Sequence, residues 1–201
     1  MPLVASEVDI AITGELFSAP RDTAAPTDAS TALPAAWIGH GYVSQDGVTE
    51  SWDDSVDNIV AWQSATVVRA ARTESVATLS CTLIQNRGSN LELYHPGSRM
   101  AASGSEWMLE VTPANADPRS FTLNVIDGDK LMRIYVGNGE VTERGDITYQ
   151  NGEPIGYEVT ITCYPDADGL LMRKFSTAAA WGEDITGGEE EAGTFAAVEA
   201  D

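Results

Sequence analysis

Three stretches of the sequence alternate between apolar and polar residues, and this pattern limits the fold more than any other feature. Residues 77–83, 121–125 and 157–163 carry an apolar side chain at every second position, with Thr, Ser, Asn or Glu in between. A period of two gives a β-strand one apolar and one polar face. Residues 132–136 repeat the pattern after the turn sequence Asp127-Gly128-Asp129, which predicts a β-hairpin.

Two further strands and one helix complete the expected fold. Residues 37–43 and 170–175 are the additional strand candidates, and residues 89–94 are the best helix candidate, ended by Pro96 and Gly97. The chain is therefore expected to be mainly β, as a two-sheet sandwich or partly closed barrel with one short flanking α-helix.

The first 36 residues differ in composition from the rest of the chain. They are rich in Ala, Thr, Ser, Pro and Asp, and three prolines block a helix: Pro20, Pro26 and Pro34. We expect residues 1–36 to form an extended arm that gains order by lying on a neighbouring copy of the chain. The apolar residues expected to be buried there are Leu16, Phe17 and Leu33.

The rest of the chain divides into a folded domain and a tail. Residues 37–181 hold the predicted strands and the helix, whereas residues 182–201 include three consecutive glutamates at 189–191. A run of like charges predicts a solvated acidic tail.

Residues 50–62 form an acidic segment between two strands. The segment contains Glu50, Asp53, Asp54 and Asp57. Its apolar residues have helical spacing, but the density of carboxylates favours a mobile loop with at most one helical turn.

Acidic residues dominate the charge of the whole chain. Asp and Glu total 31 against 11 Lys and Arg, which gives a formal net charge of −20. Such a field repels phosphate backbones and excludes ordinary nucleic-acid binding, but it suits a surface past which DNA slides without sticking. The outward positions of the predicted strands carry mostly Thr, Ser and Asn, as expected of a face that joins copies of itself or lines a neutral or acidic channel.

No targeting or membrane segment is expected. The N-terminal stretch lacks the basic and apolar regions of a signal peptide, and no run of eighteen apolar residues occurs. We therefore expect the protein to be made in the cytoplasm and to bind no membrane.

The histidines and cysteines form no catalytic or zinc pattern. His40 and His95 lack a Ser, Cys or second His at a spacing that defines a nucleophile or a metal site, so both are interpreted as surface or loop residues. Cys81 and Cys163 sit in alternating strand patterns and are expected to be reduced core cysteines.

Two carboxylate-rich sequences invite a metal interpretation. Asp127 and Asp129 are a common hairpin composition, while Asp166, Asp168 and Gly169 lack the distal Glu of an EF-hand. Both are interpreted as turns. The sequence thus predicts no metal, no cofactor and no enzymatic activity.

Four segments together resemble a known family. They are APTDAS at residues 25–30, LPAAWIGHGYVSQDGVTESWDDS at 33–55, TLSCTLIQNRGSNLELYHPG at 78–97 and RIYVGNGEVTERGDI at 133–147. Their succession resembles the major tail (tail tube) proteins of siphophages, especially those of phages that infect actinobacteria. The sequence departs from that family at the HPG of residues 95–97 and in the acidic stretch after Trp181.

The resemblance implies a particular assembly. A β-sandwich with a flanking helix would form hexameric rings, and the rings would stack around a tape-measure protein. Four strands per subunit would join across six subunits into an inner barrel through which double-stranded DNA passes without specific binding. The implied partners are further copies of the chain and the tape-measure, tail tip and tail terminator proteins. The implied location is the tail of the virion, assembled in the host cytoplasm.

The concentration of negative charge in the acidic segment suggests a role for it in such an assembly. We expect Glu50, Asp53, Asp54 and Asp57 to become fixed between stacked rings. Arginines of a neighbouring copy would offset part of their charge, and the candidates are Arg69, Arg72 and Arg144. The alternative is a solvated surface loop that contributes little to any interface.

Two other classes of function are the alternatives to a tail tube subunit. A tail terminator or capsid decoration protein would share the fold class. A β-sandwich ligand-binding module would need a clustered aromatic site, whereas the five tryptophans are scattered along the chain and are interpreted as core or interface residues.

Overall fold

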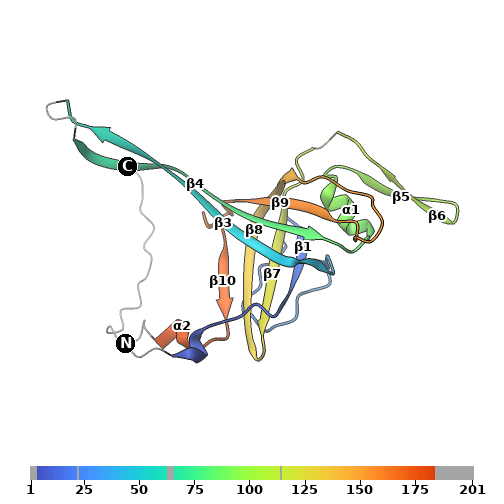
Figure 1. Cartoon of the computed structure of the whole chain (residues 1–201), viewed down its shortest axis with the longest axis horizontal. Coiled ribbons are helices and arrows are strands. Elements are labelled where there is room, and N and C mark those ends of the chain that lie inside the picture. Colours follow the sequence, from blue (N-terminus) through green and yellow to red (C-terminus); the bar gives the residue numbers. More distant parts are fainter. Residues whose placement is uncertain (1–3, 22, 63–65, 114, 184–201) are drawn as a thin grey trace.

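The computed structural model describes residues 4–21, 23–62, 66–113 and 115–183, which form a mainly β structure as predicted (Figure 1). The strands are β1 (Thr13–Pro20), β2 (Ile38–Gly39), β3 (Val43–Val60), β4 (Val67–Leu83), β5 (Arg99–Ser103), β6 (Glu106–Glu110), β7 (Arg119–Asp127), β8 (Lys130–Arg144), β9 (Tyr157–Tyr164) and β10 (Arg173–Ser176). The helices are α1 (Gly88–Tyr94), α2 (Ala180–Glu183) and a short 3-10 turn, η1 (Ala5–Glu7). None of the helices in the described residues is long and apolar enough to cross a membrane.

One antiparallel sheet contains every strand except β5 and β6, which pair with each other. Its order is β2-β1-β7-β8-β9-β4-β3, and β10 also pairs with β8. β8 changes neighbours along its length, because residues 132–135 pair with β10 and residues 138–144 pair with β9. Gly139 lies at this change, where a Cβ atom would come within 2.8 Å of the Phe121 ring. The sheet is therefore divided into two halves that share β8.

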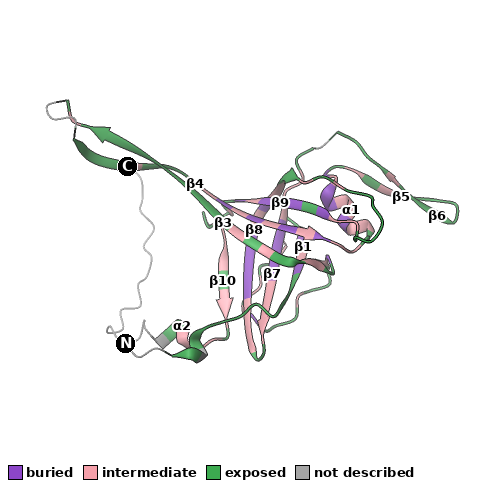
Figure 2. Ribbon diagram, in the orientation of Figure 1, coloured by how far each residue is buried: buried purple, intermediate pink, exposed green. Residues whose placement is uncertain are grey.

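The two halves of the sheet enclose one apolar core. Its members include Leu16 (β1), Phe121 (β7), Val136 (β8), Leu79 (β4), Ile161 (β9) and Leu93 (α1). Because strands from both ends of the sheet contribute to one core, the sheet curls around it as a partly closed barrel, and the buried residues gather there (Figure 2).

A second, smaller cluster covers the other face of β1 and β8. Its buried residues are Ala19, Trp37 and Tyr135, and its partly buried residues are Phe17, Leu33 and Phe175. Trp37 packs edge-on against Tyr135, with ring centroids 6.1 Å apart. The segment that follows β1 thus lies on its own sheet.

Arg133 of β8 holds that segment in place. It is 4% exposed, and its Nη1 donates to the carbonyl oxygens of Asp28 and Thr31, each at 2.9 Å. Its Nε donates to Asn124 Oδ1 at 2.8 Å. The Asp28 carboxylate fixes the turn at residues 28–31, because it accepts hydrogen bonds from the side chain and the backbone N–H of Thr31. These hydrogen bonds lower the pKa of Asp28.

The prediction that residues 1–36 form an arm on a neighbouring copy is wrong for β1 and for the segment after it. β1 pairs with β7 along its whole length. Leu16 belongs to the core of its own chain, while Phe17 and Leu33 pack against the second cluster. β1 is covered on both faces, with Leu16 on one and Phe17 on the other. Its sequence therefore shows no alternation between apolar and polar residues.

The strands predicted from alternation are confirmed. Residues 77–83, 121–125, 132–136 and 157–163 lie within β4, β7, β8 and β9 respectively. The predicted turn between β7 and β8 is also present, with Gly128 at a positive φ of 57°. The helix predicted at residues 89–94 is α1, which begins one residue earlier.

The outer elements were predicted less well. Residues 37–43 contain only the two-residue β2 and the first residue of β3, because a positive φ of 75° at Gly41 interrupts the extended backbone. Only residues 173–175 of the strand predicted at 170–175 lie in β10. Residues 184–201 of the predicted acidic tail lie outside the described residues.

Candidate functional site

β3 and β4 form a long antiparallel hairpin that extends beyond the rest of the sheet (Figure 1). Their pairing runs from Val43 with Leu83 to Val60 with Val67. The prediction of a loop with at most one helical turn is wrong, because residues 50–60 belong to β3. Both faces of the outer part are exposed (Figure 2), so no apolar–polar alternation marks it as a strand.

Glu50 anchors the root of this hairpin to β10. Its carboxylate accepts hydrogen bonds from Lys174 Nζ at 2.7 and 2.8 Å and from Trp52 Nε1 at 2.7 Å. Burial raises the pKa of Glu50, but the hydrogen bonds and the charge of Lys174 outweigh burial and leave the pKa below its ordinary value. Glu50 therefore stabilises its own subunit and is not free to bind a neighbouring copy.

The other three acids lie on the outer part of the hairpin. Asp54 faces Arg72 of the same hairpin at 3.5 Å, an exposed ion pair that contributes little to stability. Among the described residues, neither Asp53 nor Asp57 has a cationic side chain within 4.0 Å. Asp53 and Asp57 are thus the members of the predicted acidic set that remain open to a partner.

The arginines expected to offset this charge lie in three different settings. Arg72 is paired within its own hairpin, as described above. Arg144 lies beside α1, where it donates to the Tyr94 carbonyl oxygen at 3.3 Å and stacks 5.7 Å from the Tyr94 ring centroid. Arg69 is exposed on the hairpin, opposite Ile59. Of the three, only the Arg69 side chain makes no hydrogen bond or ion pair with the described residues of its own subunit.

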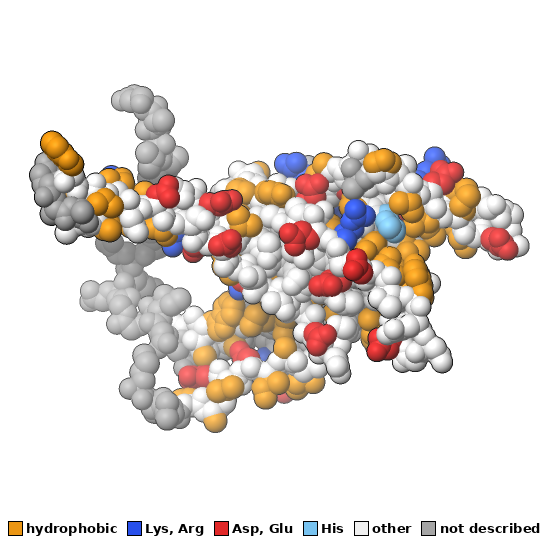
Figure 3. All heavy atoms as spheres, turned by 45° about the horizontal axis from the view of Figure 1, so that its top comes forward, with side chains coloured by type: hydrophobic (Ala, Val, Ile, Leu, Met, Phe, Trp, Pro, Cys, Tyr) orange, Lys and Arg blue, Asp and Glu red, His pale blue; other side chains and the backbone are white. Residues whose placement is uncertain are grey.

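The far end of the hairpin carries apolar side chains that the described chain leaves uncovered. They are Val56, Ile59, Val60, Val67, Val68 and, at 96% exposure, Trp62. Figure 3 shows hydrophobic side chains at this end and acidic ones along the hairpin. Large exposed apolar side chains gathered at one end of a projecting hairpin are typical of a surface that contacts another molecule.

A second surface is the outward face of four adjacent strands, β3, β4, β9 and β8. Residues directly opposite one another form two rows across these strands. The rows are Ser51-Thr78-Thr162-Glu140 and Thr49-Ser80-Thr160-Glu143. The intervening residues, such as Leu79 and Ile161, point into the core. We call this surface the hydroxyl face, and it carries the Thr and Ser residues expected at outward positions.

Both ends of the large sheet leave a strand edge free. Among the described residues, β3 pairs only with β4, and β1 pairs with β2 only at Phe17 and Ser18. A free strand edge exposes backbone donors and acceptors, so it is a template for pairing with another chain.

Ser18, His40 and Asn90 are linked by hydrogen bonds in the order of a catalytic triad, but all three are buried. Ser18 Oγ lies 2.9 Å from His40 Nε2, and His40 Nδ1 lies 2.8 Å from Asn90 Oδ1. All three residues are at most 1% exposed, so no substrate reaches the serine. His40 was interpreted as a surface or loop residue; it lies in the loop after β2, but it is buried and not on the surface. The group instead joins β1 and the end of β2 to α1.

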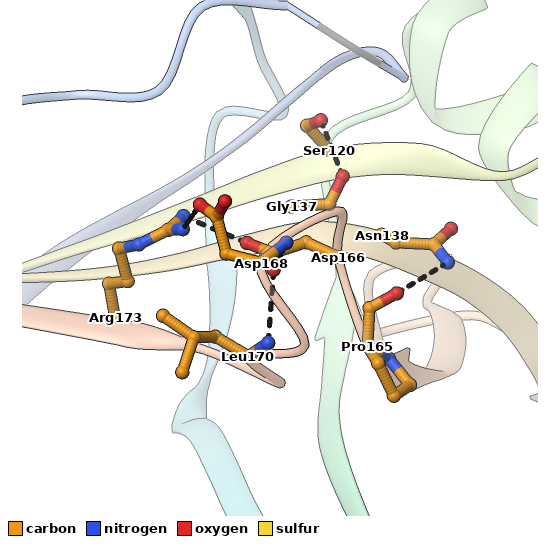
Figure 4. A network of polar contacts seen from close by, with 8 residues as sticks. All are labelled: Ser120, Gly137, Asn138, Pro165, Asp166, Asp168, Leu170 and Arg173. Atoms are coloured by element: carbon orange, nitrogen blue, oxygen red, sulfur yellow. Dashed lines mark hydrogen bonds and ion pairs between the residues drawn. The ribbon is translucent and has the colours of Figure 1, made fainter. Parts of the chain in front are cut away.

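The turn at residues 166–169 uses its carboxylates internally (Figure 4). Arg173 contacts Asp166 at 2.9 Å and Asp168 at 2.5 Å. Asp166 Oδ1 also accepts the backbone N–H of Asp168 and of Leu170. This is a turn, as predicted. In the part of the chain that the structure describes, no group of three or more His, Cys, Asp or Glu residues could hold a metal ion.

The two cysteines are buried and free, as predicted. Burial raises the pKa of each thiol to about 12. In the β4–β9 register, Cys163 lies opposite Ala77 and Cys81 lies opposite Val159, so the two are separated along the strands by more than the span of a disulfide.

A family model described as phage tail tube protein matches residues 1–181. No curated protein matches the chain. The matched range includes the β3–β4 hairpin, the hydroxyl face and both free edges.

Proposed function

The chain belongs to the phage tail tube protein family, and on this basis we propose that it forms hexameric rings that stack into the tail tube of a siphophage. As a member of this family it is a structural component of the virion rather than an enzyme, and it assembles with copies of itself and with other tail proteins. The observation that best supports the ring is the set of four adjacent strands, β3, β4, β9 and β8, with a free edge at β3.

In the proposed ring, the four strands of six copies form one barrel, in which the free edge of β3 pairs with the next copy's β8 beyond Gly139, where β7 no longer pairs with it. About 24 strands, spaced ~4.8 Å apart and tilted by roughly 40°, give a backbone diameter of about 45–50 Å, wide enough for duplex DNA. The hydroxyl face lines the lumen in this arrangement. Its acids, Glu140 and Glu143, repel phosphate, and its hydroxyl groups release no counterions, so DNA slides past it.

The proposed lumen holds the tape-measure protein during assembly and conducts double-stranded DNA to the host afterwards. The ends of the tube contact the tail tip and tail terminator proteins, and assembly takes place in the host cytoplasm. Family membership and the net charge of −20 support this proposal, since an acidic tube gives DNA no site to bind.

Electron microscopy of the purified protein tests the proposed ring. We expect long tubes with a central channel, and end-on views with sixfold symmetry. The mass per length obtained from the same preparation gives the number of copies per ring independently. Single closed rings or unstacked sheets at every protein concentration would contradict the proposal.

We also propose that the outer part of the β3–β4 hairpin lies between stacked rings, where Asp53 and Asp57 face cationic side chains of a neighbouring copy. The support is that both acids lack a partner within their own subunit in the described residues, whereas Glu50 and Asp54 each have one. The solvated hairpin remains the alternative.

Neutralising these two acids separates the alternatives. The Asp53→Asn/Asp57→Asn chain is expected to need about fivefold more protein to form tubes, since two partly exposed ionic contacts contribute roughly 1 kcal/mol. Its assembly should also depend less on salt than that of the parent chain. Sedimentation across salt concentrations measures both effects.

The matched control is Glu106→Gln/Glu110→Gln on the β5–β6 hairpin, which removes the same charge elsewhere. It should assemble like the parent chain. If the Asp53/Asp57 variant also assembles like the parent at every salt concentration, the two acids belong to a solvated surface.

A further inference from the structure

A groove of about 700 Å³ opens between β1 and the beginning of β3. Its apolar lining includes Ile12, Leu16, Phe17, Val48, Leu123 and Val125. Glu15 and Arg87 contribute its charged side chains. The incompletely paired edge of β1 runs along it, so the groove offers backbone hydrogen-bonding groups as well as apolar surface. No described segment of the chain fills it.

The β3–β4 hairpin projects away from the body of the molecule (Figure 1), so its uncovered apolar end lies far from the beginning of β3, which borders the groove. Val48 lines the groove, and Val60 lies near the hairpin end on the same strand. At roughly 3.3 Å per residue, β3 separates them by about 40 Å. A hairpin therefore cannot reach the groove of its own chain.

We propose that the groove receives the end of the β3–β4 hairpin of a second copy of the chain. This inference rests on the proposed tube and names the surface that accepts the hairpin. The exposed side chains to be covered, Trp62, Val60 and Val67, are apolar like the lining of the groove. Burial of this surface removes apolar area from water on both copies.

The charges of the two surfaces are complementary. The hairpin carries Asp57 and Arg69, whereas the groove carries Arg87 and Glu15. Among the described residues none of the four has an oppositely charged side chain within 4.0 Å, although Arg87 donates to the Gly39 carbonyl oxygen. Docking therefore leaves each charge with a candidate partner, which favours one orientation over the reverse.

The contact is heterologous, because the two surfaces that meet are different parts of the same chain. Each copy supplies one hairpin and one groove, so after any contact a free hairpin and a free groove remain. When the rotation between successive copies does not return to the first copy, such contacts propagate as an open array instead of closing into a ring. That property is the one required for stacking rings into a tube of many repeats.

Cysteine cross-linking tests the contact directly. Val67→Cys places a thiol near the hairpin end, and Ile12→Cys places one in the groove; both positions are exposed. The native cysteines do not compete, because they are buried and their pKa is raised to about 12. Tubes of the double variant, oxidised in air with a copper catalyst, should give a reducible ladder of multimers. Unassembled protein at low concentration should stay monomeric.

The matched control is Trp107→Cys with Ile12→Cys, which places the first thiol on the other hairpin at a similarly exposed position. It should give no ladder. Tubes that form while Val67→Cys/Ile12→Cys gives no ladder, or while the control gives an equal one, overturn the groove assignment and leave the proposed tube standing. A parent chain that forms no tubes overturns both.

A second pair of variants keeps the inference testable if the cysteine chains fail to assemble. Trp62 is 96% exposed and Trp107 is 75% exposed, so replacing either by Ser removes one exposed indole without touching the core. Trp62→Ser should raise the protein concentration needed for tubes by at least about tenfold, and Trp107→Ser by less than about twofold. Equal effects, or no effect of Trp62→Ser, contradict the proposed contact.

Discussion

A chain in which residues 55–74 are replaced by Asn-Gly is expected to fold like the parent chain and to form no tubes. Asp54 and Ser75 are opposite each other in the hairpin, and Asn-Gly is the preferred two-residue connection between such positions. None of the described residues that are removed is buried. The body of the protein therefore keeps its core, while the surface proposed to join the rings is lost.

Circular dichroism, thermal unfolding and electron microscopy of the truncated chain measure these two outcomes separately. We expect the melting temperature to change by only a few degrees, and we expect sedimentation to show a monomer at concentrations where the parent forms tubes. Tubes of ordinary length from the truncated chain would show that the hairpin does not join rings.

Shortening the other hairpin provides the control for this truncation. Met100 and Leu109 are opposite each other in β5 and β6, so residues 101–108 can be replaced by the same Asn-Gly turn. The proposed contacts do not involve this hairpin, and tubes should still form. Loss of tubes in both chains would mean that any shortened hairpin disturbs assembly, and the effect of the first truncation would then not be specific.

The parts of the fold that were predicted correctly share one physical property. β4 and β9 show it most clearly, because each has one face in the core and one at least partly exposed, which produces alternation in the sequence. β7 alternates as well, although Ser120 and Thr122 on its polar face are also buried. β1 is covered on both faces, and the outer part of β3 is exposed on both. Neither environment selects for alternation, so β1 was interpreted as an arm and β3 as a loop. A strand is visible in a single sequence chiefly when it is half buried.

The candidate surfaces divide in the same way. The hydroxyl face could be predicted, because its Thr and Ser residues are the polar half of the alternating pattern. The partner of Glu50 could not, since Lys174 is 124 positions away in the sequence and meets it only through the pairing of β10 with β8. The groove could not be predicted either, because its walls come from β1, β3 and β7, and only the curl of the sheet brings these strands together.

His40 makes the folded chain sensitive to acid. Burial lowers its pKa to about 4 from an ordinary value of 6.5; the hydrogen bond with Asn90 opposes this, and the charges of Arg119 and Arg87 add to it. The unfolded chain therefore binds a proton at a higher pH than the folded chain. The resulting stability is fully present above about pH 6.5 and is lost as the pH falls through about 4. Its size is roughly 3 kcal/mol at 1.36 kcal/mol per pKa unit.

Comparison with a His40→Gln chain isolates this contribution from the many carboxylates, because every other titrating group is common to both chains. The free energy of unfolding, obtained from urea titrations at pH 7 and pH 4, should fall by about 3 kcal/mol more in the parent than in the variant. Gln keeps a hydrogen-bonding group beside Ser18 but cannot take up the proton. If the free energy of unfolding falls by the same amount in both chains, His40 is protonated without cost and the buried link between β1 and α1 persists in acid.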